Sequence, residues 1–327
     1  MRYFVTGATG FLGSEIVRQL VDRGDGVVAL VRSPEKTDRL PDDVEIAIGD
    51  ITEKATMREP MAGADGVFHI AGWYNIGVDD PESAKRINVD GTRLVLELMD
   101  ELDIPRGVYT STLAVFSDTN GARPDESYRY DGPHLTRYDL TKWRAHYEVA
   151  EPMVEDGLPL IILQPGAIYG PGDRGPTWDL WQAFLRRRLP AIPSSVGYCF
   201  GHVEDTARAH LRAMDDGTPG ESYIVAGEPL SLVEVFEIVE AITGRRAPIA
   251  VPPAMFRILA RLISPVDGLL PRQYSAEAMR VLGGVTYYGD NSKATRELDL
   301  EHRPIRAGLQ ETLESEMVQL GIEPGRR

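Results

Sequence analysis

The chain has few cysteines and few lysines. Among its 327 residues there is one cysteine, Cys199, so no internal disulfide can form, and a small buried hydrophobe is the expected role of that residue. Only five residues are lysine, and 50 acidic residues outnumber 35 basic ones, which gives a formal net charge of −15. Because nucleic acids bind to basic surfaces, this charge argues against a nucleic-acid partner.

The chain also lacks an apolar run long enough to cross a bilayer, since charges and a proline interrupt its most apolar late stretch, 254–270. Its opening residues, MRYFVTG, indicate a buried strand before a glycine turn, so no signal peptide is expected. We therefore expect a cytoplasmic protein with no membrane partner. The six histidines include no H-x-x-x-H pair with a nearby carboxylate, so no metal site is expected.

Strand and helix patterns alternate through the first half of the chain. Strands are expected at residues 2–6, 27–31, 44–48, 66–70, 107–111 and 160–164. Helices are expected at about 11–24, 81–102 and 137–155. This alternation predicts an α/β fold with a doubly wound parallel sheet.

Proline and glycine become frequent after Pro165. Short loops and strands there separate further expected helices, at about 177–188, 204–215, 231–243, 252–264 and 304–320. The change predicts a smaller, mixed α/β C-terminal domain at 166–327, mainly for substrate binding, over the carboxyl edge of the sheet. Some of its segments, at about 198–226, are candidates to return to the first domain.

A glycine-rich turn lies between the first expected strand and helix. Its sequence, TGATGFLG, spaces three glycines as G-x-x-G-x-x-G: Gly7, Gly10 and Gly13. Such glycines permit a tight turn, let a pyrophosphate approach the backbone and pack the helix on the strand. Other N–H groups of the turn would also face the anion: those of Thr9, Phe11 and Leu12. The motif predicts a dinucleotide site, with an ordinary β–α turn as the alternative.

The end of the second strand favours NADP(H) over NAD(H). An NAD site usually has Asp or Glu about 20 residues after the glycines, to bind the ribose 2′-OH. Arg32 and Ser33 stand there instead, and a guanidinium can bind a 2′-phosphate bidentately. After the third strand, the Asp50 carboxylate and the Ile51 N–H are placed to hold the adenine. Residues 1–165 are thus expected to form an NADP-binding Rossmann domain, with NAD and a merely solvated Arg32 as alternatives.

Tyr138 and Lys142 form a Y-x-x-x-K pair on the second long helix, where residues four apart share a face. A tyrosine has an unperturbed pKa of about 10, so the pair would need the ammonium and an oxidised nicotinamide to lower it. Ser111 and Thr112 end the fifth strand, where a hydroxyl can bind a substrate oxygen. The set predicts general acid–base catalysis beside hydride transfer. For the pair alone, two residues on a solvated helix face are the alternative.

The order of these motifs resembles the extended branch of the short-chain dehydrogenase/reductase superfamily, the NAD-dependent epimerase/dehydratase family. Besides TGATGFLG and Y-x-x-x-K, the matching stretches are GDI (49–51), FHIAG (68–72), NVDGT (88–92), YTSTLAVF (109–116), QPGAIYGPGD (164–173), HVEDTARAH (202–210) and YYGDNSKATREL (287–298). The resemblance covers nearly the whole chain. It implies an enzyme with the catalytic residues Thr112, Tyr138 and Lys142, in which the lysine also orients the ribose.

The resemblance implies further contacts. Five residues would line the cofactor: Ala71, Gly72, Pro165, Ala167 and Ile168. The apolar and aromatic loop Trp73-Tyr74-Asn75-Ile76 suits an organic carbonyl, and the substrate residues would be Trp73, Tyr74, Ser111, Thr112 and Tyr138. Asn88 would support the structure. The family often dimerises through two long helices, which implies a homodimer through residues of about 81–102 and 137–155.

Nucleotide-sugar enzymes of the family match less well. Their epimerases usually carry Asn where this chain has Ala167, and their dehydratases carry Asp-Glu where it has Leu113-Ala114. The run with Arg32 resembles the dihydroflavonol 4-reductase-like group, which reduces ketones and aldehydes with NADPH. We expect an NADP(H)-dependent oxidoreductase acting on a small carbonyl or alcohol. Two alternatives stay open: a nucleotide-sugar epimerase with bound NAD, and a dinucleotide-sensing protein without turnover.

Overall fold

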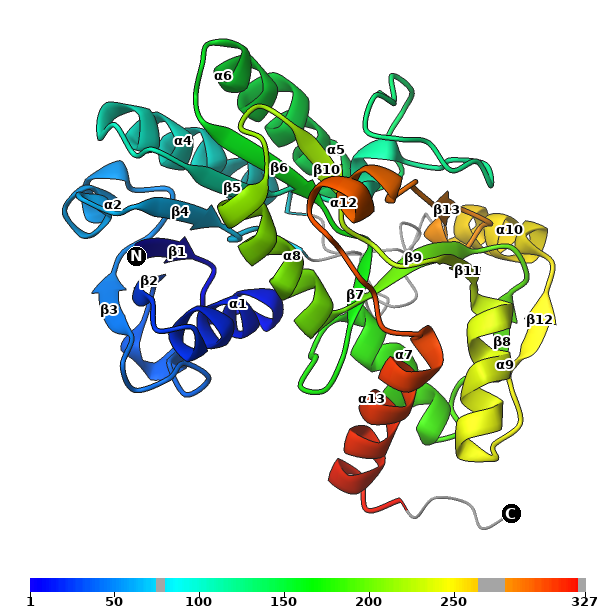
Figure 1. The fold of residues 1–327 in the computed structure, drawn as a ribbon. Helices are drawn as coiled ribbons and strands as arrows, with labels where there is room; N and C mark the ends of the chain where they lie inside the picture. Colours follow the sequence, from blue (N-terminus) through cyan, green and yellow to red (C-terminus); the bar gives the residue numbers. More distant parts are fainter. Residues whose placement is uncertain (75–79, 264–279, 323–327) are drawn as a thin grey trace.

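The computed structural model describes residues 1–74, 80–263 and 280–322, and a parallel seven-stranded sheet lies at its centre (Figure 1). Its strands are β1 (Arg2–Thr6), β2 (Gly26–Val31), β3 (Glu45–Ile48), β4 (Gly66–His69), β5 (Gly107–Thr110), β6 (Leu160–Gln164) and β10 (Ser222–Ile224). Their order is β10-β6-β5-β4-β1-β2-β3. The chain first builds outward from β1 to β3 and then from β4 to the other edge. The switch point between β1 and β4 is where such sheets bind ligands.

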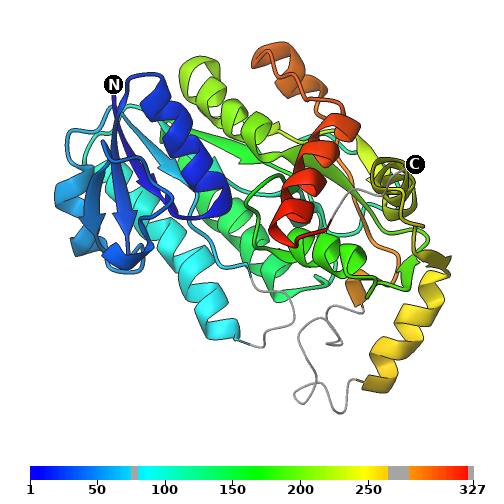
Figure 2. The same cartoon turned by 90° about the horizontal axis from the view of Figure 1, so that it is seen from below.

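Helices cover both faces of this sheet, as Figures 1 and 2 show. One face carries α1 (Phe11–Asp22) and α8 (Val203–Asp216). The other carries α2 (Lys54–Met61), α3 (Pro81–Lys85), α4 (Thr92–Glu101), α5 (Arg137–Ala145) and α6 (Glu151–Glu155). The middle strands are buried along almost their whole length, which is why they are continuous apolar runs. The predicted Rossmann-type α/β fold is confirmed.

Each of the two long helices contains a π-helical segment that the sequence pattern did not predict. Arg86–Gly91 joins α3 to α4, and His146–Ala150 joins α5 to α6. In the first segment Gly91 packs closely on the sheet side, since a Cβ there would lie 2.8 Å from Ile51 Cδ1. Such π segments are frequent at functional sites. Here one carries Asn88 and the other His146, which both bond to residues described below.

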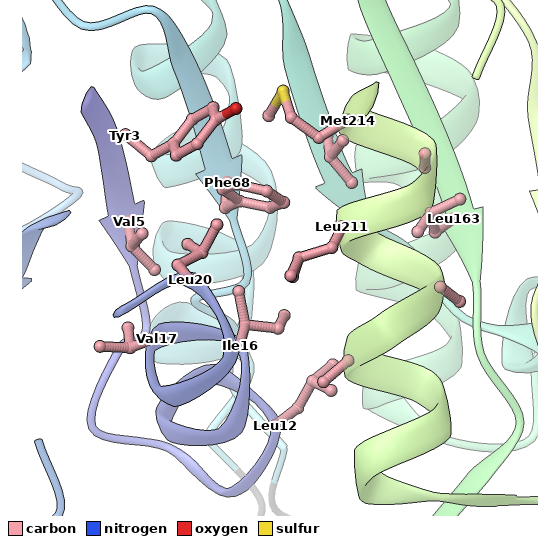
Figure 3. Packing of buried hydrophobic residues seen from close by; sticks show 14 of the residues in the cluster. Tyr3, Val5, Leu12, Ile16, Val17, Leu20, Phe68, Leu163, Leu211 and Met214 are labelled. Carbon is pink, nitrogen blue, oxygen red and sulfur yellow. The ribbon is translucent and has the colours of Figure 1, made fainter. Parts of the chain in front are cut away.

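A core of apolar side chains joins α1 and α8 to the sheet (Figure 3). Ile16 of α1 and Leu211 of α8 both point toward Phe68 of β4 in that view. Because α8 and β10 come from the second half of the chain, that half returns to the parallel sheet. Strand β9 (Gly197–His202) belongs to a different sheet, so only the later part of the predicted segment 198–226 returns. We keep the domain division near residue 165 as a proposal.

The rest of the second half is a smaller mixed region. Around β9 lie β7 (Ala167–Tyr169), β11 (Pro229–Ser231) and β13 (Thr286–Tyr287), while β8 (Ala191–Pro193) pairs with β12 (Ile249–Val251). Its helices are α7 (Pro176–Leu185), α9 (Leu232–Thr243), α10 (Pro253–Ile263) and α13 (Ile305–Gln319), and α12 (Ser292–Glu297) lies near β10. Within the described ranges no helix has the length and apolarity needed to span a membrane.

Ile16 provides a test of the core between α1 and the sheet. It is fully buried in the cluster, so Ile16→Ala should lower the free energy of unfolding by about 2–5 kcal/mol through lost burial and a residual cavity. Urea unfolding followed by circular dichroism measures this change. Val318→Ala on α13 is the control, because Val318 is 81% exposed and its truncation should cost less than about 0.5 kcal/mol. Equal losses in both variants would contradict the packing described here.

Candidate active site

The glycine turn connects β1 to α1 at the switch point of the sheet. Gly7 has a φ of +72°, and a Cβ on it would lie 2.6 Å from the Ala71 nitrogen. A Cβ on Gly13 would lie 2.1 Å from the Gly7 carbonyl oxygen. Neither position tolerates a side chain, so these glycines are needed for the tight turn and for the close approach of helix and strand.

The N-terminus of α1 suits an anion. Its capping residue, Gly10, offers no side chain, and the first turn contains no acidic residue. The first backbone hydrogen bond of the helix runs from Ser14 N–H to the Gly10 carbonyl at 2.9 Å. The N–H groups of Phe11, Leu12 and Gly13 therefore precede the intrahelical ladder and carry the positive end of the helix dipole. This geometry fits the pyrophosphate of a dinucleotide.

The residues expected to hold the adenosine follow the ends of β2 and β3, at the same edge of the sheet. Arg32 is exposed and, within the part of the chain that the structure describes, it has no carboxylate partner. Ser33 caps a short 3-10 helix by accepting the Glu35 N–H at 3.4 Å. The Asp50 carboxylate accepts both the N–H and the hydroxyl of Thr52 at 2.9 Å. Arg32 is thus the member of this group whose charge is available to a ligand.

Tyr138 and Thr112 meet in front of the sheet. Tyr138 lies in the first turn of α5, which is capped by Thr136 through a 3.0 Å bond from the Asp139 N–H. Burial raises the pKa of the Tyr138 phenol, and a hydrogen bond from the Thr112 side chain opposes this shift. Thr112 Oγ1 accepts the Ala114 N–H at 3.1 Å, which leaves its own proton for donation.

Lys142 is buried behind this pair. Its Nζ donates to the Tyr109 hydroxyl at 2.9 Å and to the Thr110 carbonyl oxygen at 2.7 Å. Burial lowers its pKa to about 7. In this structure burial dominates the pKa of the Tyr138 phenol, and the Lys142 amine is directed to Tyr109. That Lys142 lowers the Tyr138 pKa when a nicotinamide is bound stays a prediction.

Asn88 holds the predicted substrate loop against α5. Its Oδ1 accepts the Trp73 N–H at 2.6 Å, and its Nδ2 donates to the Trp73 carbonyl at 3.0 Å and to Thr141 Oγ1 at 2.9 Å. The Trp73 side chain is buried, whereas Tyr74 is 47% exposed with its ring centroid 4.6 Å from that of Tyr138. Tyr74 therefore borders the phenol. The rest of the predicted loop, Asn75-Ile76, lies outside the described residues.

Ser111 does not face the same way as Thr112. It is buried, and its Oγ lies 2.7 Å from His146 Nδ1 on the π-helical segment. Successive residues of an extended strand point to opposite sides, which explains why only one of the two hydroxyls reaches Tyr138. The contact of Ser111 with substrate stays a prediction, and in this structure its hydroxyl is bonded to His146.

The segment after β6 borders the site on the side that the second half of the chain forms. The Pro165 carbonyl accepts the Leu113 N–H at 2.9 Å, and Ala167 and Ile168 begin β7, which pairs with β9. A Cβ on Gly166 would lie 2.0 Å from the carbonyl oxygen of Cys199, so the two strands touch there. Cys199 itself is buried, as predicted. On the opposite side, Ala71 and Gly72 follow β4 and adjoin the glycine turn.

Three residues near the pair were missed in the sequence. Asp139 is buried, and its Oδ2 accepts the hydroxyl of Tyr287 on β13 at 3.0 Å, which links the C-terminal half to α5. Tyr109 bonds to Lys142 as described. A usable signal existed for Tyr109: it is two residues before Ser111 in the same extended segment and so shares its face, toward α5.

The buried amine predicts a dependence of stability on pH. A folded-state pKa near 7, below the unfolded value of about 10.4, means that the unfolded chain binds more protons between them, so stability rises with pH in that window. Lys142→Met removes this contribution. The variant should gain more stability over the native chain at about pH 6 than at about pH 9, by about 1–3 kcal/mol. Urea unfolding at both pH values measures the difference, and parallel pH curves for the two proteins would refute it.

Comparison with known proteins agrees with this arrangement. Residues 3–226 match the NAD dependent epimerase/dehydratase family. A putative dihydroflavonol 4-reductase of Synechocystis sp. is 33% identical over 94% of this chain and 92% of its own length, and sterol demethylase protein B of Methylococcus capsulatus is 30% identical over 94% and 95%. The crystal structure of gox2253 superposes with a TM-score of 0.84 at 29% identity, over 98% of this chain and 99% of that one. The chain belongs to the NAD-dependent epimerase/dehydratase family of extended short-chain dehydrogenases/reductases.

Proposed function

We propose that this protein is an NADP(H)-dependent oxidoreductase that interconverts a carbonyl and an alcohol on a moderately apolar small molecule. The observation that carries the proposal is that the Thr112 side chain lies close enough to the Tyr138 phenol to lower its pKa, with Lys142 one helical turn away, at the edge of the sheet that also bears the glycine turn. The relative named as a putative dihydroflavonol 4-reductase supports reductase chemistry, and the one named as sterol demethylase protein B supports an apolar, ring-containing substrate.

In the proposed mechanism, the glycine turn and the strand ends would hold NADP(H), which would supply the hydride chemistry at the carbon of the reacting C–O group. Thr112 donates a hydrogen bond to the oxygen of that group and holds it near Tyr138. In reduction Tyr138 gives its proton to the oxygen, and in oxidation it takes the proton back. Because burial raises the pKa of Tyr138, the phenol is protonated near neutral pH and begins as an acid. Lys142 would bind the ribose and stabilise the tyrosinate.

The choice of NADP rests on Arg32. Its exposed guanidinium follows β2, where a 2′-phosphate would lie, and none of the described carboxylates pairs with it. The remaining contacts proposed for the dinucleotide are those of the turn and the strand ends: Gly7, Thr9, Gly10, Phe11, Leu12, Gly13, Ser33, Asp50, Ile51, Ala71, Gly72, Lys142, Pro165, Ala167 and Ile168. A carbonyl or alcohol is the proposed partner in the reaction, and Tyr74 is the proposed wall of its site.

The proposed assembly is a homodimer through the faces of α3–α4 and α5–α6 that point away from the sheet. The alternatives for the activity are an epimerase that keeps NAD bound and a dinucleotide sensor without turnover. The family model includes epimerases, but Ala167 and the pair Leu113-Ala114 replace the polar residues that the nucleotide-sugar enzymes use.

Tyr138→Phe tests the acid–base role. The variant keeps the ring but has no proton to donate, so turnover of a carbonyl panel with NADPH should fall by about 10³-fold. NADPH affinity should stay within about threefold, because the phenol is assigned to the substrate side of the site. Absorbance of the reduced nicotinamide measures turnover, and fluorescence titration measures binding.

The native chain provides the control for these alternatives. Native protein that binds a dinucleotide but turns over no carbonyl or alcohol would favour the sensor. Protein that is purified with NAD bound, does not exchange it for NADPH and interconverts a nucleotide sugar would favour the epimerase. Undiminished carbonyl turnover in Tyr138→Phe would overturn the proposed mechanism.

Arg32→Ala tests the cofactor preference. Loss of a charge-assisted, bidentate contact to the 2′-phosphate should weaken NADPH binding by about tenfold or more, while NADH binding should change by less than about twofold. Titration with both dinucleotides gives the two ratios, and Arg39→Ala, an exposed arginine in the following loop, is the matched control. An equal loss for NADPH and NADH would contradict the assignment of Arg32 to the phosphate.

A further inference from the structure

A chain of buried hydrogen bonds runs beneath the site, from Lys142 to the glycine turn. Lys142 Nζ donates to the Tyr109 hydroxyl at 2.9 Å, and the Thr92 side chain lies close enough to this hydroxyl to act on its pKa. Thr92 Oγ1 lies 2.9 Å from His69 Nε2, and His69 Nδ1 lies 2.8 Å from Thr6 Oγ1. All five side chains are buried, and each comes from a different element: α5, β5, the start of α4, and the neighbouring strands β4 and β1.

The direction of these bonds follows from their first member. A charged Lys142 can only donate, so the Tyr109 oxygen accepts and its own proton is free for Thr92. Thr92 then donates to Nε2 of His69, which leaves Nδ1–H of the ring to donate to Thr6. Burial lowers the pKa of His69 to about 3, so the ring is neutral, as this direction requires. Every bond in the chain thus has one donor and one acceptor.

Tyr109 contacts the Lys142 amine in two ways. The amine lies 4.5 Å from the centroid of the Tyr109 ring, so one residue offers it both a π face and an oxygen acceptor. Among the described residues, the other titratable groups near Lys142 are His69 on β4, His146 on the following π-helical segment and Tyr138 one turn earlier on α5. Burial lowers the pKa of both histidines, so neither ring supplies a counter-charge.

We propose that Tyr109 is a positioning residue of the active site, whose hydroxyl, oriented by Thr92 and His69, holds the Lys142 side chain and favours its protonated form. This inference rests on the proposed function, in which Lys142 acts on the tyrosinate of Tyr138. It adds that the charge state of Lys142 depends on the orientation of the Tyr109 hydroxyl. Uncharged side chains that are hydrogen-bonded in a row as far as Thr6 set this orientation. Thr6 Oγ1 also accepts the Ala71 N–H at 3.3 Å, so this row of side chains ends next to the glycine turn.

Tyr109→Phe isolates the hydroxyl, because phenylalanine keeps the ring and its π face while it removes the acceptor. An acceptor stabilises the charged form of an amine, so its loss should lower the pKa of Lys142 by about one unit, a tenfold loss of proton affinity. The measurement is a pH titration, monitored by NMR, of the 327-residue protein with ¹³C-labelled lysine side chains. With five lysines the spectrum is simple, and the Lys142 signal is the one missing in Lys142→Met.

Two further variants test this row of side chains. Thr92→Val removes the group that orients the Tyr109 hydroxyl and should lower the Lys142 pKa in the same direction by a smaller amount, whereas Thr92→Ser should restore the native value. Tyr223→Phe is the matched control: it deletes another buried phenol hydroxyl of the same sheet, on β10, where the partners are Glu297 and the Thr218 N–H. It should cost stability without moving the Lys142 titration.

The outcomes separate a positioning role from a structural one. A Lys142 pKa in Tyr109→Phe within about 0.2 units of the native value would overturn the proposal, even where urea unfolding shows lost stability. If Tyr109→Phe does not fold, the contrast between Thr92→Val and Thr92→Ser decides alone, and equal titrations in these two overturn it. Because NMR needs no turnover, the result stands apart from the proposed function. With a substrate, the pH profile of alcohol oxidation by Tyr109→Phe should move upward while the KM for NADP stays near the native value.

Discussion

The site depends on one buried amine, that of Lys142, to which no buried carboxylate among the described residues is bonded. Moving an ammonium out of water is costly, and a protein offsets the cost only through close and well-directed acceptors. Lys142 has two such acceptors, the Tyr109 hydroxyl and the Thr110 carbonyl, and both belong to β5. These bonds fix α5 against the carboxyl end of β5, at the edge of the sheet where the proposed site lies. The register between helix and strand is therefore set by the same residue that the proposed reaction uses.

Other contacts of α5 complete this fixation. Thr136 caps the helix six residues before Lys142, and Thr141 Oγ1 accepts the Asn88 amide, which also holds the Trp73 backbone. Asp139 accepts the Tyr287 hydroxyl from β13, so the second half of the chain is attached to the same helical turn. The turn that carries Tyr138 is thus held from several sides by side-chain contacts. A proton donor that must meet a substrate oxygen within hydrogen-bond distance needs this kind of support.

Much of this arrangement follows from local sequence signals. The glycine turn, the six strands from β1 to β6 and the Y-x-x-x-K pair are encoded by spacing and by periodicity, and a parallel sheet brings their ends together. The features that were missed depend on contacts between distant segments. The π-helical segments keep the apolar pattern of a helix, the three-residue strand β10 carries too short a pattern, and the direction of the Ser111 and Lys142 side chains is decided by His146 and Tyr109.

Burial acts in opposite directions on the two members of the pair. It raises the pKa of Tyr138 and lowers that of Lys142 to about 7, because in each case the charged form is the one that loses its water. Around neutral pH the phenol therefore keeps its proton, while the amine is close to its own titration. A site of this kind is prepared to donate a proton, as reduction of a carbonyl requires.

To accept a proton in oxidation, the site needs an added stabilisation of the tyrosinate. Within the described chain, the group one helical turn from the phenol that can supply such charge is Lys142 itself, so whatever favours the protonated amine also favours oxidation. The direction of the proposed reaction is in this sense coupled to the acceptors beneath the lysine.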